Sequence, residues 1–253
     1  MTEQEMAKKA ISLLDLTSLN ENDNDEAVIK LCERANSKFG KAAAVCVWSK
    51  FIPLCKKELE GTGIKIATVV NFPEGSTDID KTVAETKQAI KDGADEIDVV
   101  FPYKAFLEGD KEIGKKLVEA TRKACGDKIK LKVIIESGVL EKSVYIAEAS
   151  RIAIDAGADF IKTSTGKTKV SATVEAANAM IESIKLSGKK VGFKASGGIR
   201  DRKQAAAYLT IAKSIMGENW ISSQNFRFGA SGLLDDLLAA LGENATNKAE
   251  GGY

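Results

Sequence analysis

Short runs of aliphatic and β-branched residues recur along the chain, and segments with helically spaced apolar positions separate them. The runs predict eight strands, at residues 13–17, 43–47, 65–70, 96–101, 131–135, 160–163, 191–194 and 226–229. The intervening segments predict helices at residues 80–91, 112–125, 143–155, 174–185 and 204–216. Because strands that alternate with helices form right-handed βαβ units, this pattern predicts an α/β fold with a parallel sheet.

Eight such units in 253 residues fit a closed (β/α)8 TIM barrel. We predict a single barrel domain over residues 1–253, with an N-terminal helical extension and a flexible C-terminal tail at residues 242–253. A doubly wound open sheet is the alternative, but it usually has fewer strands, and the glycine fingerprints of dinucleotide sites and P-loops are absent. Gly166-Lys-Thr168 resembles the end of a P-loop, yet Ile161 stands where the first glycine is needed.

Composition narrows the possible functions. The chain has no histidine, which excludes His-based triads and His zinc sites. Its net charge is +1 without a long basic block, so we expect no nucleic-acid partner. It contains no apolar run of about 18 residues and no apolar signal core, and its four cysteines lack Cys-x-x-Cys spacing. We therefore expect a cytoplasmic protein that acts on a small molecule, away from membranes.

Two lysines, Lys162 and Lys194, each stand near the end of a short apolar run that opens into a loop of small residues. Lysine is rarely buried without a reason. A desolvated amine beside a second cation has a lowered pKa and can attack a carbonyl group. The alternative is that both lysines face the helices or solvent, as a single lysine at a strand end ordinarily does.

A repeated sequence motif relates the position of Lys162 to that of a carboxylate. Gly93-Ala-Asp-Glu-Ile-Asp98 returns as Gly157-Ala-Asp-Phe-Ile-Lys162, 64 residues later, which is the length of two βα units. Structurally, the phrase is typical of a glycine helix cap and a tight turn into a strand. It places Asp98 and Lys162 at the same register of alternate strands, which contribute to one interior layer of a barrel. With Lys194 on the next strand, three charged side chains should meet at the carboxyl end of the barrel.

Glycine-rich loops after the last three predicted strands indicate a phosphate site, because barrels commonly bind phosphate there. The candidate residues are Thr165, Gly166, Lys167, Gly197, Gly198, Gly229, Ala230 and Ser231. The alternative is that these glycines only form tight turns. Asp15, at the end of the first predicted strand, is a candidate to orient Lys194, or else a turn or cap residue before the next helix.

In combination, these motifs resemble the deoxyribose-phosphate aldolases, class I Schiff-base aldolases of the (β/α)8 type. The resemblance extends over essentially the whole chain, through residues 14–17, 71–73, 98–102, 132–136, 160–167, 192–198 and 227–231. It implies that Lys162 forms the Schiff base, that Lys194 is the second lysine and that Asp98 is a proton relay. It also implies that Tyr253 enters the site and assists proton transfer. Gly232 stands where some relatives have serine, which puts one phosphate hydrogen bond in doubt.

The activity that this resemblance implies is the reversible cleavage of 2-deoxyribose 5-phosphate to glyceraldehyde 3-phosphate and acetaldehyde, a lyase reaction of deoxyribose phosphate catabolism. It implies no metal and no organic cofactor, and it implies a homo-oligomer, either a dimer or a tetramer. Three alternatives stay open. They are another Schiff-base barrel enzyme, such as a transaldolase or a ketose-phosphate aldolase, a phosphate-binding sugar isomerase, and a noncatalytic sugar-phosphate sensor.

Overall fold

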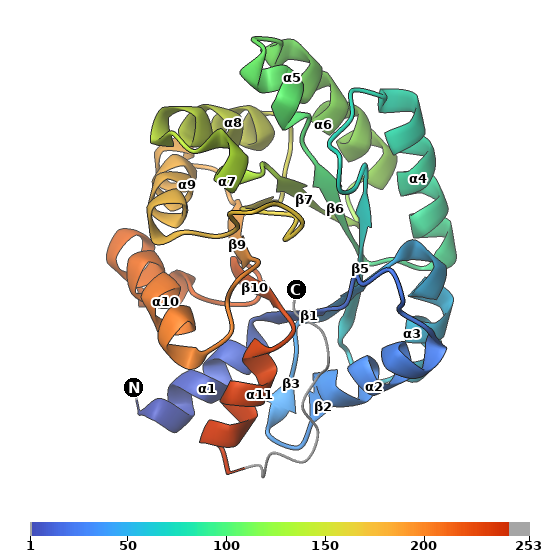
Figure 1. The fold of residues 1–253 in the computed structure, drawn as a ribbon, viewed down its shortest axis with the longest axis vertical. Coiled ribbons are helices and arrows are strands. Elements are labelled where there is room, and N and C mark those ends of the chain that lie inside the picture. The colour runs from blue at the N-terminus through green and yellow to red at the C-terminus, as the bar shows by residue number, and fades with distance from the viewer. Residues whose placement is uncertain (1, 243–253) are drawn as a thin grey trace.

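Eight parallel strands stand at the centre of the molecule inside a ring of helices (Figure 1). The computed structural model describes residues 2–242, so Tyr253 and nearly all of the predicted tail lie outside the described residues. The barrel strands are β1 (Leu14–Thr17), β4 (Ala44–Val47), β5 (Lys65–Val70), β6 (Glu96–Val100), β7 (Lys130–Ile134), β8 (Phe160–Lys162), β9 (Gly192–Ser196) and β10 (Phe226–Ala230). They close in the order β1-β10-β9-β8-β7-β6-β5-β4. The predicted (β/α)8 barrel is confirmed, and the open-sheet alternative is wrong.

Helices surround this barrel (Figure 1). They are α1 (Glu3–Ser12), α2 (Asp25–Ala35), α3 (Ile52–Glu58), α4 (Ile79–Asp92), α5 (Tyr103–Leu107), α6 (Lys111–Cys125), α7 (Ser137–Leu140), α8 (Ser143–Asp155), α9 (Val174–Ser187), α10 (Arg202–Met216) and α11 (Leu233–Ala240). Two 3-10 turns, η1 (Ser49–Phe51) and η2 (Glu218–Trp220), and an antiparallel pair, β2 (Asn36–Ser37) and β3 (Gly40–Lys41), complete the elements. Within residues 2–242, no helix has the length and apolar character needed to cross a membrane.

The helix ends follow from local side-chain chemistry. The predicted N-terminal extension is α1, which begins with a reciprocal capping box between Thr2 and Glu5 and packs against α10 and α11. Asp78 caps α4 through the backbone N–H of Lys81, and Gly93 ends that helix at a left-handed φ of 111°. Such caps satisfy backbone groups that a helix leaves unpaired at its ends. They fix where each helix stops and the following strand begins.

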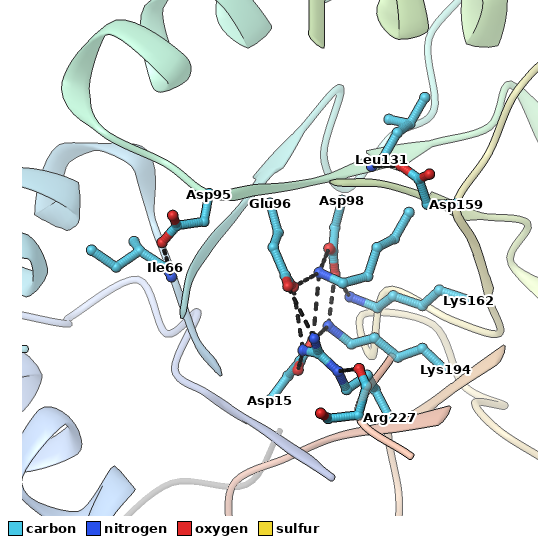
Figure 2. Close-up of polar contacts among 12 residues, drawn as sticks. Asp15, Ile66, Asp95, Glu96, Asp98, Leu131, Asp159, Lys162, Lys194 and Arg227 are labelled. Atoms are coloured by element: carbon cyan, nitrogen blue, oxygen red, sulfur yellow. Dashed lines mark hydrogen bonds and ion pairs between the residues drawn. The ribbon is translucent and has the colours of Figure 1, made fainter. Parts of the chain in front are cut away.

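The repeated Gly-Ala-Asp phrase has the same structural role in both places. The Asp95 carboxylate accepts a hydrogen bond from the backbone N–H of Ile66 at 2.9 Å, and the Asp159 carboxylate accepts one from Leu131 at 2.8 Å (Figure 2). In each case the aspartate backbone N–H donates back to the same residue, Ile66 or Leu131. Through these two hydrogen bonds, each aspartate attaches the start of its strand to the preceding strand. Three residues further on, the two strands carry Asp98 and Lys162.

Candidate active site

Seven charged side chains meet inside the barrel, where a (β/α)8 fold ordinarily places bulky apolar residues. Figure 2 shows labelled members of this group from several strands pointing toward one another. Each is at most 2% exposed, and burial of a charge is costly unless it is paired. We call this group the buried charge network. Its members are Asp15, Glu96, Asp98, Lys132, Lys162, Lys194 and Arg227.

Asp98 joins the three lysines of the buried charge network. Its Oδ2 accepts hydrogen bonds from the Nζ atoms of Lys162 at 2.9 Å and Lys194 at 2.8 Å. Its Oδ1 accepts one from Lys132 Nζ at 2.6 Å. Burial alone would raise the pKa of Asp98, but the three lysines outweigh burial and hold that pKa well below its ordinary value. The structure thus places an ionised carboxylate between both lysines that the sequence singles out.

Asp15 lies within β1 and holds Lys194 from another side. Its Oδ2 lies 2.5 Å from Lys194 Nζ, and its Oδ1 lies 2.5 Å from an Arg227 nitrogen. Burial favours a higher pKa for Asp15, but Lys194 and Arg227 keep the pKa below its ordinary value. The cap alternative for Asp15 is wrong, because Asn24 caps the next helix, α2.

The register of the strands corrects one expectation. Asp98 pairs with Lys132 on β7, which pairs with Phe160 on β8, so Lys162 stands two residues beyond the register of Asp98. Barrel strands tilt, which shifts a level layer by about one residue for each strand. The offset of two residues over two strands therefore brings Asp98 and Lys162 to one height. Lys162 and Lys194 are direct register partners.

Sequence analysis did not single out Lys132, Glu96 or Arg227 as site residues. Lys132 Nζ lies 2.7 Å from Glu96 Oε2, and Arg227 Nη2 lies 3.0 Å from Glu96 Oε1. The available signal was a charged residue flanked by apolar ones inside a predicted strand, as in Leu131-Lys-Val133 and Phe226-Arg-Phe228. In a barrel, such a residue points either inward or toward the helices, and the pattern alone does not distinguish the two.

The candidate phosphate loop after β8 is held from two sides. Glu136, at a left-handed φ of 54°, accepts hydrogen bonds from the Thr165 backbone N–H at 3.2 Å and from its hydroxyl at 2.5 Å. Burial raises the pKa of Glu136. Lys167 Nζ donates to the Leu19 backbone carbonyl at 2.8 Å. Between these two anchors, Gly166 takes the left-handed φ of 77° that a tight turn requires.

The loop after β9 contacts that loop. Gly197 has a φ of 82°, and a Cβ on it would lie 3.3 Å from the Cα atom of Gly166. A Cβ on Gly198, whose φ is 78°, would meet no atom of residues 2–242 within 4 Å. The two predicted glycine loops therefore lie side by side. Gly198 borders open space, as a turn that receives a ligand requires.

The third predicted loop is differently built. Gly229 and Ala230 belong to β10, not to the loop after it, and buried Ser231 follows them before α11. A Cβ on Gly229 would come within 2.2 Å of Ser196 Oγ and 3.0 Å of Lys194 Cε. Gly229 thus makes room for the Lys194 side chain. Gly229 and Ala230 stand at the end of β10, and their part in phosphate binding stays a prediction.

The buried carboxylates predict a loss of stability in acid. Because the folded-state pKa values of Asp15 and Asp98 are lowered, the unfolded chain binds more protons as the pH falls, and the folded state loses its advantage. We expect the free energy of unfolding in urea to fall as the pH drops below about 4. High salt should not remove this effect, because salt screens surface pairs far more than buried ones. A stability independent of pH between 5 and 2.5 in 1 M salt, a high ionic strength, would contradict it.

Comparisons with known proteins agree with this architecture. The sequence model of the DeoC/LacD family aldolases matches residues 9–238. A candidate deoxyribose-phosphate aldolase from Toxoplasma gondii ME49 superposes with a TM-score of 0.87 at 25% identity, covering 94% of each chain. Another from Coccidioides immitis gives a TM-score of 0.80 at 27% identity, covering 90% of this chain and 85% of the other.

A third solved structure shares the fold. The deoxyribose phosphate aldolase of Aeropyrum pernix, which is a tetramer, superposes with a TM-score of 0.77 at 23% identity, covering 95% of this chain and 93% of the other. The family match spans nearly the whole described chain and includes every member of the buried charge network. The chain therefore belongs to the DeoC/LacD family of aldolases.

Proposed function

We propose that this aldolase cleaves 2-deoxyribose 5-phosphate to glyceraldehyde 3-phosphate and acetaldehyde through a Schiff base on Lys162. The observation that carries the proposal is the Lys162 amine, which lies 2.9 Å from Asp98 inside a buried network that also contains Lys194. The candidate deoxyribose-phosphate aldolases among the similar structures support the choice of substrate.

The network contains more cationic than anionic side chains. Its four cationic side chains face only three carboxylates, and an unpaired buried charge is costly. Arginine keeps its proton in proteins. Burial would lower the pKa of Lys132, but the three carboxylates around it outweigh burial and raise that pKa. Lys162 and Lys194 are the two remaining cationic side chains of the network.

Of these two lysines, Lys162 is the better candidate for the nucleophile. It contacts one carboxylate, Asp98, whereas Lys194 contacts both Asp98 and Asp15. A neutral amine is the form of lysine that attacks a carbonyl group. We infer that Lys162 is the nucleophile and that Lys194, which contacts two carboxylates, is the second lysine of the site.

The proposed reaction follows from these roles. Lys162 attacks the C1 aldehyde of the open-chain sugar, and loss of water gives an iminium ion that can accept an electron pair. Asp98, through a water molecule, removes the C3 hydroxyl proton as the C2–C3 bond breaks, and glyceraldehyde 3-phosphate leaves. The remaining enamine is protonated at C2 and hydrolysed to acetaldehyde. Asp98 and Lys194 share these proton transfers, and Asp15 holds Lys194 in place.

The phosphate end of the substrate belongs at the adjoining glycine loops. Thr165, Gly166 and Lys167 follow β8, Gly197 and Gly198 follow β9, and Ser231 follows β10. The first two loops begin directly beyond the strands that carry Lys162 and Lys194. A sugar phosphate bound there would reach from the amine to the loops.

Borohydride reduction in the presence of acetaldehyde, followed by peptide mass mapping, tests the proposal. A two-carbon adduct on Lys162 would identify the nucleophile, the donor and the imine together. Absence of any adduct would reject a Schiff-base aldolase and favour a phosphate-binding isomerase or a noncatalytic sensor. An adduct that forms only with a ketose phosphate would favour a transaldolase or ketose-phosphate aldolase.

Deletion of Tyr253 should slow solvent exchange of the acetaldehyde methyl protons by about 100-fold or more, a typical contribution of a general acid or base. The reason is its proposed part in proton transfer at C2, since a phenol both donates and accepts protons. Deuterium exchange followed by NMR measures the rate. The apparent affinity for 2-deoxyribose 5-phosphate should change little, and an unchanged exchange rate would reject the role of Tyr253.

Several expectations stay predictions for this chain. They are the assembly into a homo-oligomer, the cytoplasmic location, the independence from metals and cofactors, and the single-domain organisation. Within residues 2–242, no group of three or more His, Cys, Asp or Glu side chains is placed to hold a metal ion.

A further inference from the structure

A buried hydroxyl at the end of β9 has no hydrogen-bond partner. Ser196 is 0% exposed, and its Oγ atom contacts no donor or acceptor in the described part of the chain. Its backbone is fully engaged, because its N–H donates to Thr163 Oγ1 at 3.0 Å and its carbonyl accepts from that hydroxyl at 3.2 Å. A buried hydroxyl without a partner destabilises the fold, and alanine would avoid this cost. The observation points to a partner that arrives with a ligand.

The position of the hydroxyl indicates where that ligand lies. Ser196 is two residues beyond Lys194 on one strand, so both side chains point to the same face. Ser196 Oγ and Lys194 Cε both lie against Gly229, because a Cβ there would come within 2.2 Å of the first atom and 3.0 Å of the second. The glycine loop of Gly197 and Gly198 begins at the next residue. The Ser196 hydroxyl therefore lies between the cationic end of Lys194 and the candidate phosphate loop.

We propose that Ser196 is a specificity-determining residue that binds the C4 hydroxyl of the sugar phosphate. The inference rests on the proposed function, which fixes the order of the substrate groups. C1 is bonded to Lys162, the C3 oxygen must reach Asp98, and the phosphate lies at the glycine loops. The C4 hydroxyl is the remaining polar group between C3 and the phosphate, and the unpartnered hydroxyl faces that interval.

A site that hydrogen-bonds a substrate hydroxyl rejects an analogue that lacks it, because the protein group is then left unpaired. In the synthetic direction, the C4 hydroxyl is the α-hydroxyl of the acceptor aldehyde. Ser196 should therefore select acceptors that carry an α-hydroxyl. Ser196 should contribute nothing to the binding of acceptors that lack an α-hydroxyl.

The test compares two acceptors in carbon–carbon bond formation with saturating acetaldehyde. One is D-glyceraldehyde 3-phosphate, and the other is 3-oxopropyl phosphate, which lacks the α-hydroxyl. In Ser196→Ala, kcat/KM should fall about tenfold for the first acceptor, the effect of one hydrogen bond, and stay nearly unchanged for the second. Ligand-free Ser196→Ala should also melt about 2 °C or more above the wild type, because it removes an unpaired buried hydroxyl.

The matched control is Ser137→Ala, since the Ser137 hydroxyl on α7 is also buried and unpartnered. This substitution should leave kcat/KM unchanged for both acceptors. Equal losses for both acceptors, or no loss for glyceraldehyde 3-phosphate, in an active enzyme would overturn the role of Ser196 alone. A wild type that joins acetaldehyde to neither acceptor and forms no adduct on Lys162 would overturn the proposed function, and this inference with it.

Discussion

Replacement of Lys162 with methionine should lower the turnover of 2-deoxyribose 5-phosphate by about 10⁴-fold or more, because the Schiff base cannot form without the amine. The fold should persist. Methionine has nearly the volume of the lysine stem, and Asp98 keeps Lys132 and Lys194 as partners. The measurement is kcat for cleavage, together with borohydride trapping by acetaldehyde. This variant should show no two-carbon adduct beyond the background alkylation of exposed lysines that a denatured control also shows.

Lys132→Met is the matched variant for Lys162→Met. Lys132 is equally buried and bonds the same carboxylate, but it also contacts Glu96 and Asp15 and is proposed to keep its charge. It can lose activity through the disturbed network, yet its Lys162 should still be trapped as the two-carbon adduct. Cleavage by Lys162→Met near the wild-type rate, or an adduct on another lysine, would refute the assignment.

The fold and the centre of the site follow from local signals. Each predicted barrel strand is present with its ends shifted by two residues or fewer. Asp98 and Lys162 were predictable together because one phrase, Gly-Ala-Asp, starts both strands in the same way. The predicted helical ranges do not include α2, α3, α5, α7 and α11. Of these, α5 and α7 have five and four residues, too few for a helical period to show.

Other features depend on how the barrel closes. Lys132 and Arg227 belong to the network only because their strands turn those side chains inward, and a charged residue in an apolar run does not reveal its face. The part of Gly229 in accommodating Lys194 needs the distance across two neighbouring strands. The anchoring of Thr165 by Glu136 joins residues 29 positions apart and left no pattern in the sequence.

Replacement of Arg227 with methionine should lower the free energy of unfolding by about 3–5 kcal/mol, the cost of removing one partner from a buried ion pair. Arg227 is 2% exposed and donates to Asp15 Oδ1 at 2.5 Å and Glu96 Oε1 at 3.0 Å. The lysines of the network hold the other oxygen of each carboxylate. Methionine would therefore leave two carboxylate oxygens buried without donors, and such groups are costly in a dry interior.

Urea unfolding of Arg227→Met and of Arg151→Met distinguishes the loss of the buried Arg227 ion pairs from the general effect of replacing an arginine. Arg151 lies 4.0 Å from Glu148 with its side chain 68% exposed, so its replacement should change stability by no more than about 0.5 kcal/mol. Equal stabilities for the two variants would mean that water or rearranged lysines replace the guanidinium. A loss confined to Arg227→Met would instead mean that the pairs of Arg227 with Asp15 and Glu96 stabilise the centre of the barrel.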